Sequence, residues 1–148
     1  MLTRHANIAV DIPAGWRDES TILFVAPPAA STLPTTASVT APGEAVALRF
    51  ALARGRTADA LLSEQVDLAR AADAELVTGE SAAFNCQLGH GRLVELQMKI
   101  ANQTIIQLLA CVVTGPLAVM ATASTGSIGF SAARPRLLAI LESLQVSP

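Results

Sequence analysis

The stretch Ile105–Ala123, IIQLLACVVTGPLAVMATA, is the most apolar part of this 148-residue chain and contains no charged residue. The wider run from Ile100 to Ala133 is also free of charge. Because a membrane-spanning helix needs about 20 consecutive apolar residues, the stretch has two interpretations, one membrane span or two buried strands. The choice between them decides the fold.

Three features favour two antiparallel strands. Gly115-Pro116 lies in the middle of the stretch and is a turn signal. Both halves are rich in β-branched residues, which prefer strands. No basic residues flank the stretch closely, as membrane anchors would. We therefore predict strands over Thr104–Val113 and Leu117–Ala123, with a membrane span as the alternative.

Length and composition predict a single domain covering residues 1–148, with one core. Apolar residues make up 51% of the chain and charged residues only 15%, against roughly a quarter in ordinary domains. The mean hydropathy is +0.46. Such a chain either buries nearly all of its apolar side chains or leaves an apolar surface for a partner.

Charge and cysteine content exclude several classes of function. The net charge is −2, Lys99 is the single lysine, and no basic run is present, so we expect neither a nucleic-acid nor an anionic-lipid interface. Cys86 and Cys111 match no metal-binding spacing, and we predict free thiols, with a disulfide as the alternative. Because no apolar run of signal-peptide length precedes Asp11, we expect a cytoplasmic protein.

Alternation of apolar and polar residues, with turn signals, predicts the remaining strands. They are Asn7–Ile12, Ser20–Ala26, Glu44–Arg54, Glu75–Gly79, Ser81–Leu88 and Arg92–Ile100. Helical periodicity predicts Thr57–Ala72, with Thr57 as its N-cap, and a C-terminal helix that ends near Leu144. We expect Pro135 in the first turn of that second helix. Pro27–Gly43 is rich in Pro, Ala, Ser and Thr and predicts an irregular insertion loop.

The order of these elements predicts an α+β fold. Short turns between the late strands require antiparallel pairing. We expect one antiparallel β-sheet with the helices packed on one face, which leaves the second face of the sheet available for another function.

The chain offers little for catalysis. His5 and His90 are its only imidazoles, and His90 lies between two glycines in a predicted turn. No nucleophile elbow, phosphate-binding loop, dinucleotide fingerprint or metal cluster is present in the sequence. We therefore predict a protein that is not an enzyme, with no catalytic residues, cofactor or metal; a small-ligand carrier or enzyme is a minor alternative.

The stretch Asp11–Val25, DIPAGWRDESTILFV, combines a strand, a Pro-Gly turn, a lone tryptophan and a second strand. With Pro13, Trp16, Asp18 and Ser20 at these spacings, it resembles the opening of the DcrB-like family. The order of the later strands and helices agrees with that family over nearly the whole chain. The resemblance implies the PsbP-like (Mog-type) fold.

Short members of that family without an export signal resemble the Eag-type chaperones of type VI secretion. Those chaperones bind the hydrophobic N-terminal segment of effectors that contain a PAAR domain, and help to load them on the VgrG spike. The resemblance implies a chaperone or adaptor, as a homodimer, without direct membrane insertion. The alternative is a generic PsbP-like interaction module without chaperone activity.

A chaperone of this kind shields an apolar helix with an apolar sheet face that also carries a few amide groups. Glutamine suits this role because it offers a donor and an acceptor and no charge to desolvate. Gln107 also resembles a strand glutamine that Eag-type chaperones use near their clients. The candidate client-binding residues are Arg49, Gln97, Ile105, Gln107 and Leu109. The alternative is that these are ordinary solvent-facing strand residues.

The strand Glu44–Arg54 supplies a second signal for close packing. Its apolar side alternates with a side of small residues and one arginine, namely Ala45, Ala47, Arg49, Ala51 and Ala53. Such a side is compatible with another element that approaches the strand closely.

Overall fold

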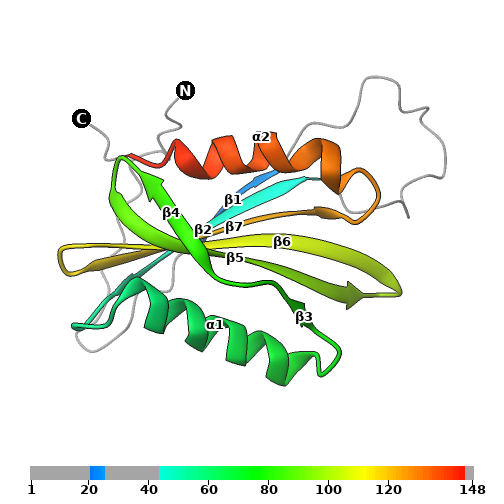
Figure 1. The fold of residues 1–148 in the computed structure, drawn as a ribbon, viewed down its shortest axis with the longest axis horizontal. Coiled ribbons are helices and arrows are strands. Elements are labelled where there is room, and N and C mark those ends of the chain that lie inside the picture. The colour runs from blue at the N-terminus through cyan, green and yellow to red at the C-terminus, as the bar shows by residue number, and fades with distance from the viewer. Residues whose placement is uncertain (1–20, 26–43, 146–148) are drawn as a thin grey trace, which may run out of the picture.

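The computed structural model describes residues 21–25 and 44–145. The expected strand Asn7–Ile12, the motif around Trp16 and the expected loop Pro27–Gly43 lie outside the described residues. Within those ranges the chain forms seven strands and two helices (Figure 1). In chain order they are β1 Thr21–Val25, β2 Ala45–Leu52, α1 Ala58–Ala72, β3 Val77–Thr78, β4 Ala82–Cys86, β5 Gly89–Ile100, β6 Gln103–Thr114, β7 Leu117–Gly126 and α2 Phe130–Glu142.

The described strands form one antiparallel sheet in the order β1-β2-β7-β6-β5-β3, with β4 also pairing to β5. This arrangement confirms the expected α+β class. The most apolar stretch folds as β6 and β7, which pair from Thr114↔Leu117 onward around the Gly115-Pro116 turn. Among the described residues, no helix has the length and apolar character needed to cross a membrane.

The two helices lie on opposite faces of the sheet, so the expectation that both pack on one face is wrong (Figure 1). On one face, which we call the α2 face, Leu137 and Leu141 pack with Leu108 and Val112 of β6. The intervening residues of β6 point to the other face, which we call the α1 face. There Leu109 and Cys111 pack in a second cluster, with Leu61 and Leu62 of α1.

The burial of the central strand β6 explains why this part of the sequence is so apolar. Leu108, Cys111 and Val112 have no measurable exposure, although they point to both faces of the sheet. A strand buried on both faces becomes a near-continuous apolar run. The apolar run predicted the strand correctly, but the same run could not show that both faces carry a helix.

Several boundaries differ from the expected ones; for example, β7 continues to Gly126 and β3 is limited to Val77–Thr78. The β4–β5 hairpin turns at Gln87-Leu88, so Gly89-His90-Gly91 belongs to β5 and is not a turn. α2 begins at Phe130, several residues before Pro135, which therefore lies inside the helix and beyond its first turn.

The close approach of β5 to β6 depends on the absence of a side chain at Gly91. A Cβ at this position would overlap the carbonyl oxygen of Cys111 and lie 2.9 Å from a methyl carbon of Val112. We predict that Gly91→Ala lowers the free energy of unfolding by roughly 3 kcal/mol or more, because backbone atoms must move in the centre of the sheet.

Urea unfolding of both variants provides the measurement and its control. At Gly79, a Cβ would meet its nearest atoms, in Glu95, at 3.6 and 3.7 Å, which is ordinary contact. Gly79→Ala should therefore change the midpoint little. Equal midpoints for the two variants would contradict the packing described for Gly91.

Candidate functional site

The α1 face contains a part that the helix does not cover. α1 packs over β5 and β6 through Leu61 and Leu62, and Ala118 and Met120 of β7 are buried in the same cluster. Beyond them, over β2 and the other half of β7, the same face carries exposed or half-buried side chains. We call this surface the β2–β7 strip. Its residues are Ala45, Ala47, Arg49 and Ala51 of β2, Thr122 and Ser124 of β7, and Gln107 of β6.

The strand register brings these residues together in rows. Ala45 lies beside Ser124, which lies beside Gln107, and this row gives two polar groups next to a methyl group. In the next row Ala47 lies beside Thr122. The side chains are therefore short near the middle of the strip, while the amide of Gln107 borders the part that α1 covers.

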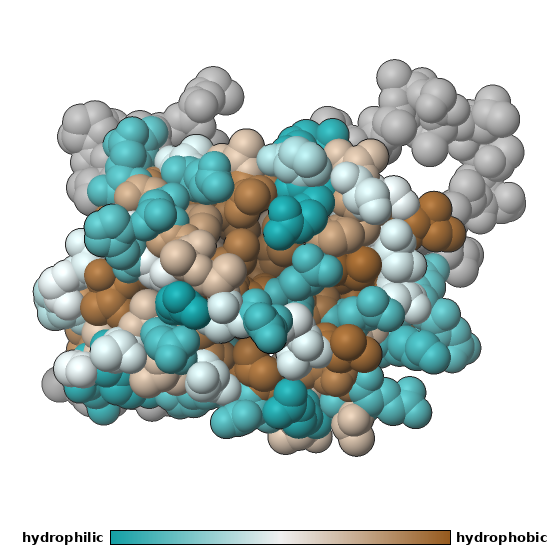
Figure 2. All heavy atoms as spheres, in the orientation of Figure 1, coloured by the Kyte–Doolittle hydropathy of each residue, from teal (hydrophilic) through white to brown (hydrophobic). Residues whose placement is uncertain are grey.

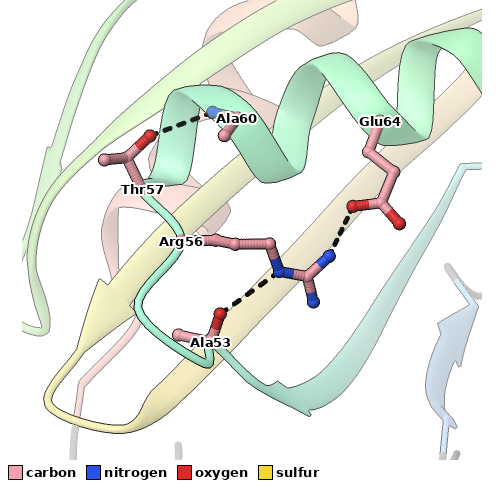
Figure 3. Close-up of polar contacts among 5 residues, drawn as sticks. All are labelled: Ala53, Arg56, Thr57, Ala60 and Glu64. Atoms are coloured by element: carbon pink, nitrogen blue, oxygen red, sulfur yellow. Dashed lines mark hydrogen bonds and ion pairs between the residues drawn. The ribbon is translucent and has the colours of Figure 1, made fainter.

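The connection between β2 and α1 holds the helix beside the strip. The buried Ala53 follows β2 and its carbonyl oxygen accepts from Nε of Arg56, at 3.2 Å (Figure 3). The same guanidinium pairs with Glu64 of α1, at 2.5 Å. Thr57 caps the helix, because its Oγ1 accepts from the amide of Ala60, at 3.1 Å. These contacts fix where the first turns of α1 cross the sheet.

The backbone turn before α1 also depends on local conformation. Arg54 and Gly55 both have positive φ angles, 52° and 77°. This pair reverses the chain directly after β2, so α1 lies against β5 and β6. The uncovered strip is therefore a consequence of where this turn sends the helix.

The dimensions and chemistry of the strip fit an apolar helix. Neighbouring strands lie about 4.8 Å apart, so two strands give a width of about 10 Å, close to the diameter of an α-helix. Small side chains allow two backbones to approach closely, as small residues do between helices in membranes. Arg49 is the only charged residue of the strip, and Gln107, Thr122 and Ser124 supply uncharged donors and acceptors.

The structure separates the five residues predicted to bind a client. Arg49 is exposed and Gln107 is half-buried, and both lie on the strip. Leu109 is on the same face but belongs to the core beneath α1, and Ile105 is also buried, with 9% exposure. Gln97 is exposed on the α2 face, since it pairs with Ile106. The five residues therefore do not form a single surface, and a prediction that groups them on one surface is wrong.

The prediction missed the polar members contributed by β7. Thr122 and Ser124 face the same side as Gln107, but the adjoining Ala121 and Ala123 are buried on the α2 face. This assignment needs the register between β6 and β7, which alternation within one strand does not give. The alanine side of β2 lies on the strip, and close packing of another element against it stays a prediction.

Chemical groups suited to catalysis are sparse in the described part of the chain. Residues 21–25 and 44–145 contain no group of three or more His, Cys, Asp or Glu side chains placed to hold a metal ion. Both cysteines are free, as expected, and Cys111 is fully buried. Burial raises the pKa of the Cys111 thiol from its ordinary value of 9.0 to about 11, because the charged thiolate is poorly solvated there.

Comparison with known proteins supports the fold. The chain matches no protein-family model, and no curated protein is similar to it at a significant level. It is similar to the crystal structure of a protein of unknown function from Pseudomonas aeruginosa, whose description suggests a regulator. The TM-score is 0.66 at 14% sequence identity, and the match covers 100% of this chain and 97% of the other. At this identity the likeness shows the shared fold alone.

The two thiols should differ in reactivity. We predict that iodoacetamide modifies the half-buried Cys86 in the folded protein near pH 8, whereas Cys111 reacts only after unfolding. Peptide mass spectrometry with and without urea measures this. Rapid modification of Cys111 in the folded state would contradict its position between α1 and the sheet.

The raised pKa of Cys111 also predicts a pH dependence. The unfolded chain loses this proton near pH 9.0 and the folded chain near pH 11, so deprotonation favours the unfolded state between these values. The contribution of Cys111 to stability is complete below pH 9.0 and decreases as the pH rises toward 11. Urea midpoints of the wild type should fall more steeply over this range than those of Cys111→Ala; parallel slopes would contradict the assignment.

Proposed function

We propose that this protein is a chaperone or adaptor for type VI secretion effectors. In this proposal, the β2–β7 strip holds the hydrophobic N-terminal segment of a PAAR-type effector and keeps it soluble until loading on the VgrG spike. The observation that carries the proposal is the β2–β7 strip, which neither described helix covers, which has one charged residue and which is bordered by α1. The resemblance of Asp11–Val25 to the DcrB-like family supplies the biological setting.

The energetics explain why such a client needs a partner. A helix of about 20 apolar residues in water exposes a large apolar area, and each Å² costs about 25 cal/mol. A helix that lies on the strip contacts apolar methyl groups of Ala45, Ala47 and Ala51, which removes part of that area from water. The shortness of these side chains lets the client backbone lie close to β2, so many dispersion contacts form.

The polar groups of the strip have a different role. Serine, threonine or glycine residues are common in helices that pack closely, and their hydroxyl and carbonyl groups need hydrogen-bond partners when water is excluded. Gln107, Ser124 and Thr122 provide these partners without a charge to desolvate. Arg49 lies where it remains exposed, and it is suited to the carbonyl end of a client helix.

The remaining parts of the proposal come from the resemblance. The protein acts in the cytoplasm before secretion, as a homodimer in which each copy offers one strip. It does not insert in the membrane and it performs no catalysis. A second copy would extend the shielded area, because one strip of about two strands cannot surround a helix.

A co-expression experiment tests the proposed function. The hydrophobic N-terminal segment of a PAAR-type effector from the same genome is fused to a soluble carrier and expressed with this protein. We expect the wild type to raise the soluble fraction of the fusion and to co-purify with it. Ala47→Trp should reduce co-purification at least about tenfold, because the indole occupies the middle of the strip.

The matched control is Ala139→Trp, which places the same side chain on the exposed surface of α2. It should bind and solubilise the fusion as the wild type does. Circular dichroism shows whether Ala47→Trp remains folded. The proposal would be contradicted if both folded variants lost co-purification equally. It would also be contradicted if the wild type did not raise the soluble fraction of any such fusion. Binding without a gain in solubility would favour a generic interaction module.

A further inference from the structure

A β-bulge interrupts the sheet edge formed by β3 and β4. Both strands pair with β5, but the register Val77↔Gln97 and the register Ala82↔Leu93 differ by one residue. As a result, Glu95 of β5 opposes two residues, Gly79 and Glu80. The amide of Gly79 donates to the carbonyl oxygen of Glu95, at 2.8 Å. A bulge of this kind bends the edge and opens the surface beside it.

A pocket of about 250 Å³ lies at the bulge, on the α2 face. Figure 2 shows hydrophobic surface in the hollow below α2. Ala82 and Leu93 contribute apolar walls, with the fully buried Leu108 beneath them. Glu80, Glu95 and Arg134 contribute charged groups. Nε of Arg134 lies 3.6 Å from Oε2 of Glu95, so that guanidinium is partly neutralised. Glu80 has no ion-pair partner within the described ranges, which gives the rim an unbalanced negative charge.

The bulge is held from the opposite face of the sheet. Arg92 donates through Nε to the hydroxyl of Ser81 and through a terminal nitrogen to the carbonyl oxygen of Ser81, both at 2.9 Å. Its guanidinium also lies 3.6 Å from the carboxylate of Asp59, in the first turn of α1. One side chain therefore anchors the bulge to β5 and to α1, so the pocket is formed before any ligand binds.

The edge next to the pocket is formed by β4, which pairs with β5 and has no second strand partner in the part of the chain that the structure describes. Cys86↔Gly89 closes a two-residue hairpin and is the hydrogen-bonded type of pair, so Ala83 and Asn85 direct their N–H and C=O groups away from β5. β4 contains no proline and no charged residue, the features with which many proteins protect such an edge.

We propose that the β4 edge and the bulge pocket together form a second docking site, for an extended segment of a partner protein. The segment adds as a strand to β4, and one aliphatic side chain passes over the methyl group of Ala82 into the pocket. A basic residue two positions along the same segment faces Glu80. Backbone hydrogen bonds give this mode its affinity and the pocket gives its specificity. The site is independent of the β2–β7 strip and of the function proposed for it.

A randomised seven-residue peptide library displayed on phage tests the proposal with the whole chain as bait. Ala82→Trp serves in counter-selection, since its indole fills the mouth of the pocket. We expect enriched peptides with an aliphatic residue and, two positions later, Arg or Lys. A synthetic peptide with this motif should bind the wild type at least about tenfold more tightly than the same peptide with Glu in place of the basic residue.

A second variant tests the edge itself. Ala83→Pro removes an outward N–H while the ladder between β4 and β5 is kept, and it should abolish binding of the synthetic peptide. Ala71→Trp, on the exposed surface of α1, should bind as the wild type does. The proposal is overturned if no motif is enriched, or if the enriched peptides bind Ala82→Trp and Ala83→Pro as tightly as they bind the wild type. It is also overturned if a second copy of the chain occupies the edge, which would be seen as a dimer that Ala83→Pro converts to a monomer.

Discussion

Burial of β6 on both faces is the constraint on which the rest of the structure depends. This twelve-residue strand lies in the sheet between β5 and β7, and most of its side chains are buried beneath one helix or the other. A charged residue at Leu108 or Cys111 would be desolvated without a partner, which costs several kcal/mol. The strand therefore carries no charge, and α1 and α2 pack separately on its two faces. The high apolar fraction of the chain follows from this double burial.

The positions of the two helices produce the candidate sites. α1 crosses β5 and β6 and leaves β2 and the part of β7 at Thr122 and Ser124 accessible on its face, whereas α2 contacts β4, β6 and β7 and leaves the bulge pocket beside β5. Each face of the sheet thus has a covered part and an accessible part. The β2–β7 strip has short side chains and is nearly uncharged, which suits a helix. The accessible part of the α2 face has the β4 edge and the bulge pocket, which suit an extended segment.

Much of the fold could be predicted from the sequence. The Gly115-Pro116 turn and the β-branched runs around it predicted β6 and β7, and Thr57 predicted the start of α1, because these signals act through local backbone preferences. The side of the sheet on which each helix packs is set by long-range contacts, those of Leu61 and Leu62 on the α1 face and those of Leu137 and Leu141 on the α2 face. No local pattern in the sequence encodes that choice.

The candidate site could be predicted only in part for the same reason. Arg49 and Gln107 lie on the β2–β7 strip, but Leu109 is covered by α1 and Gln97 lies on the other face. Alternation shows which residues share one side of a strand. It does not relate the sides of two strands, because that requires the register between them, and it does not show which side a helix covers.

The central claim is that an apolar client helix lies on the sheet beside α1. Methyl NMR of the alanine-labelled protein, titrated with a hydrophobic effector segment in a soluble fusion, tests this most directly. The account predicts large shifts or broadening for Ala45, Ala47 and Ala51 and little change for Ala132 and Ala139 on the exposed side of α2. Changes confined to α2, or binding that leaves the alanine methyl groups of β2 unchanged, would contradict it.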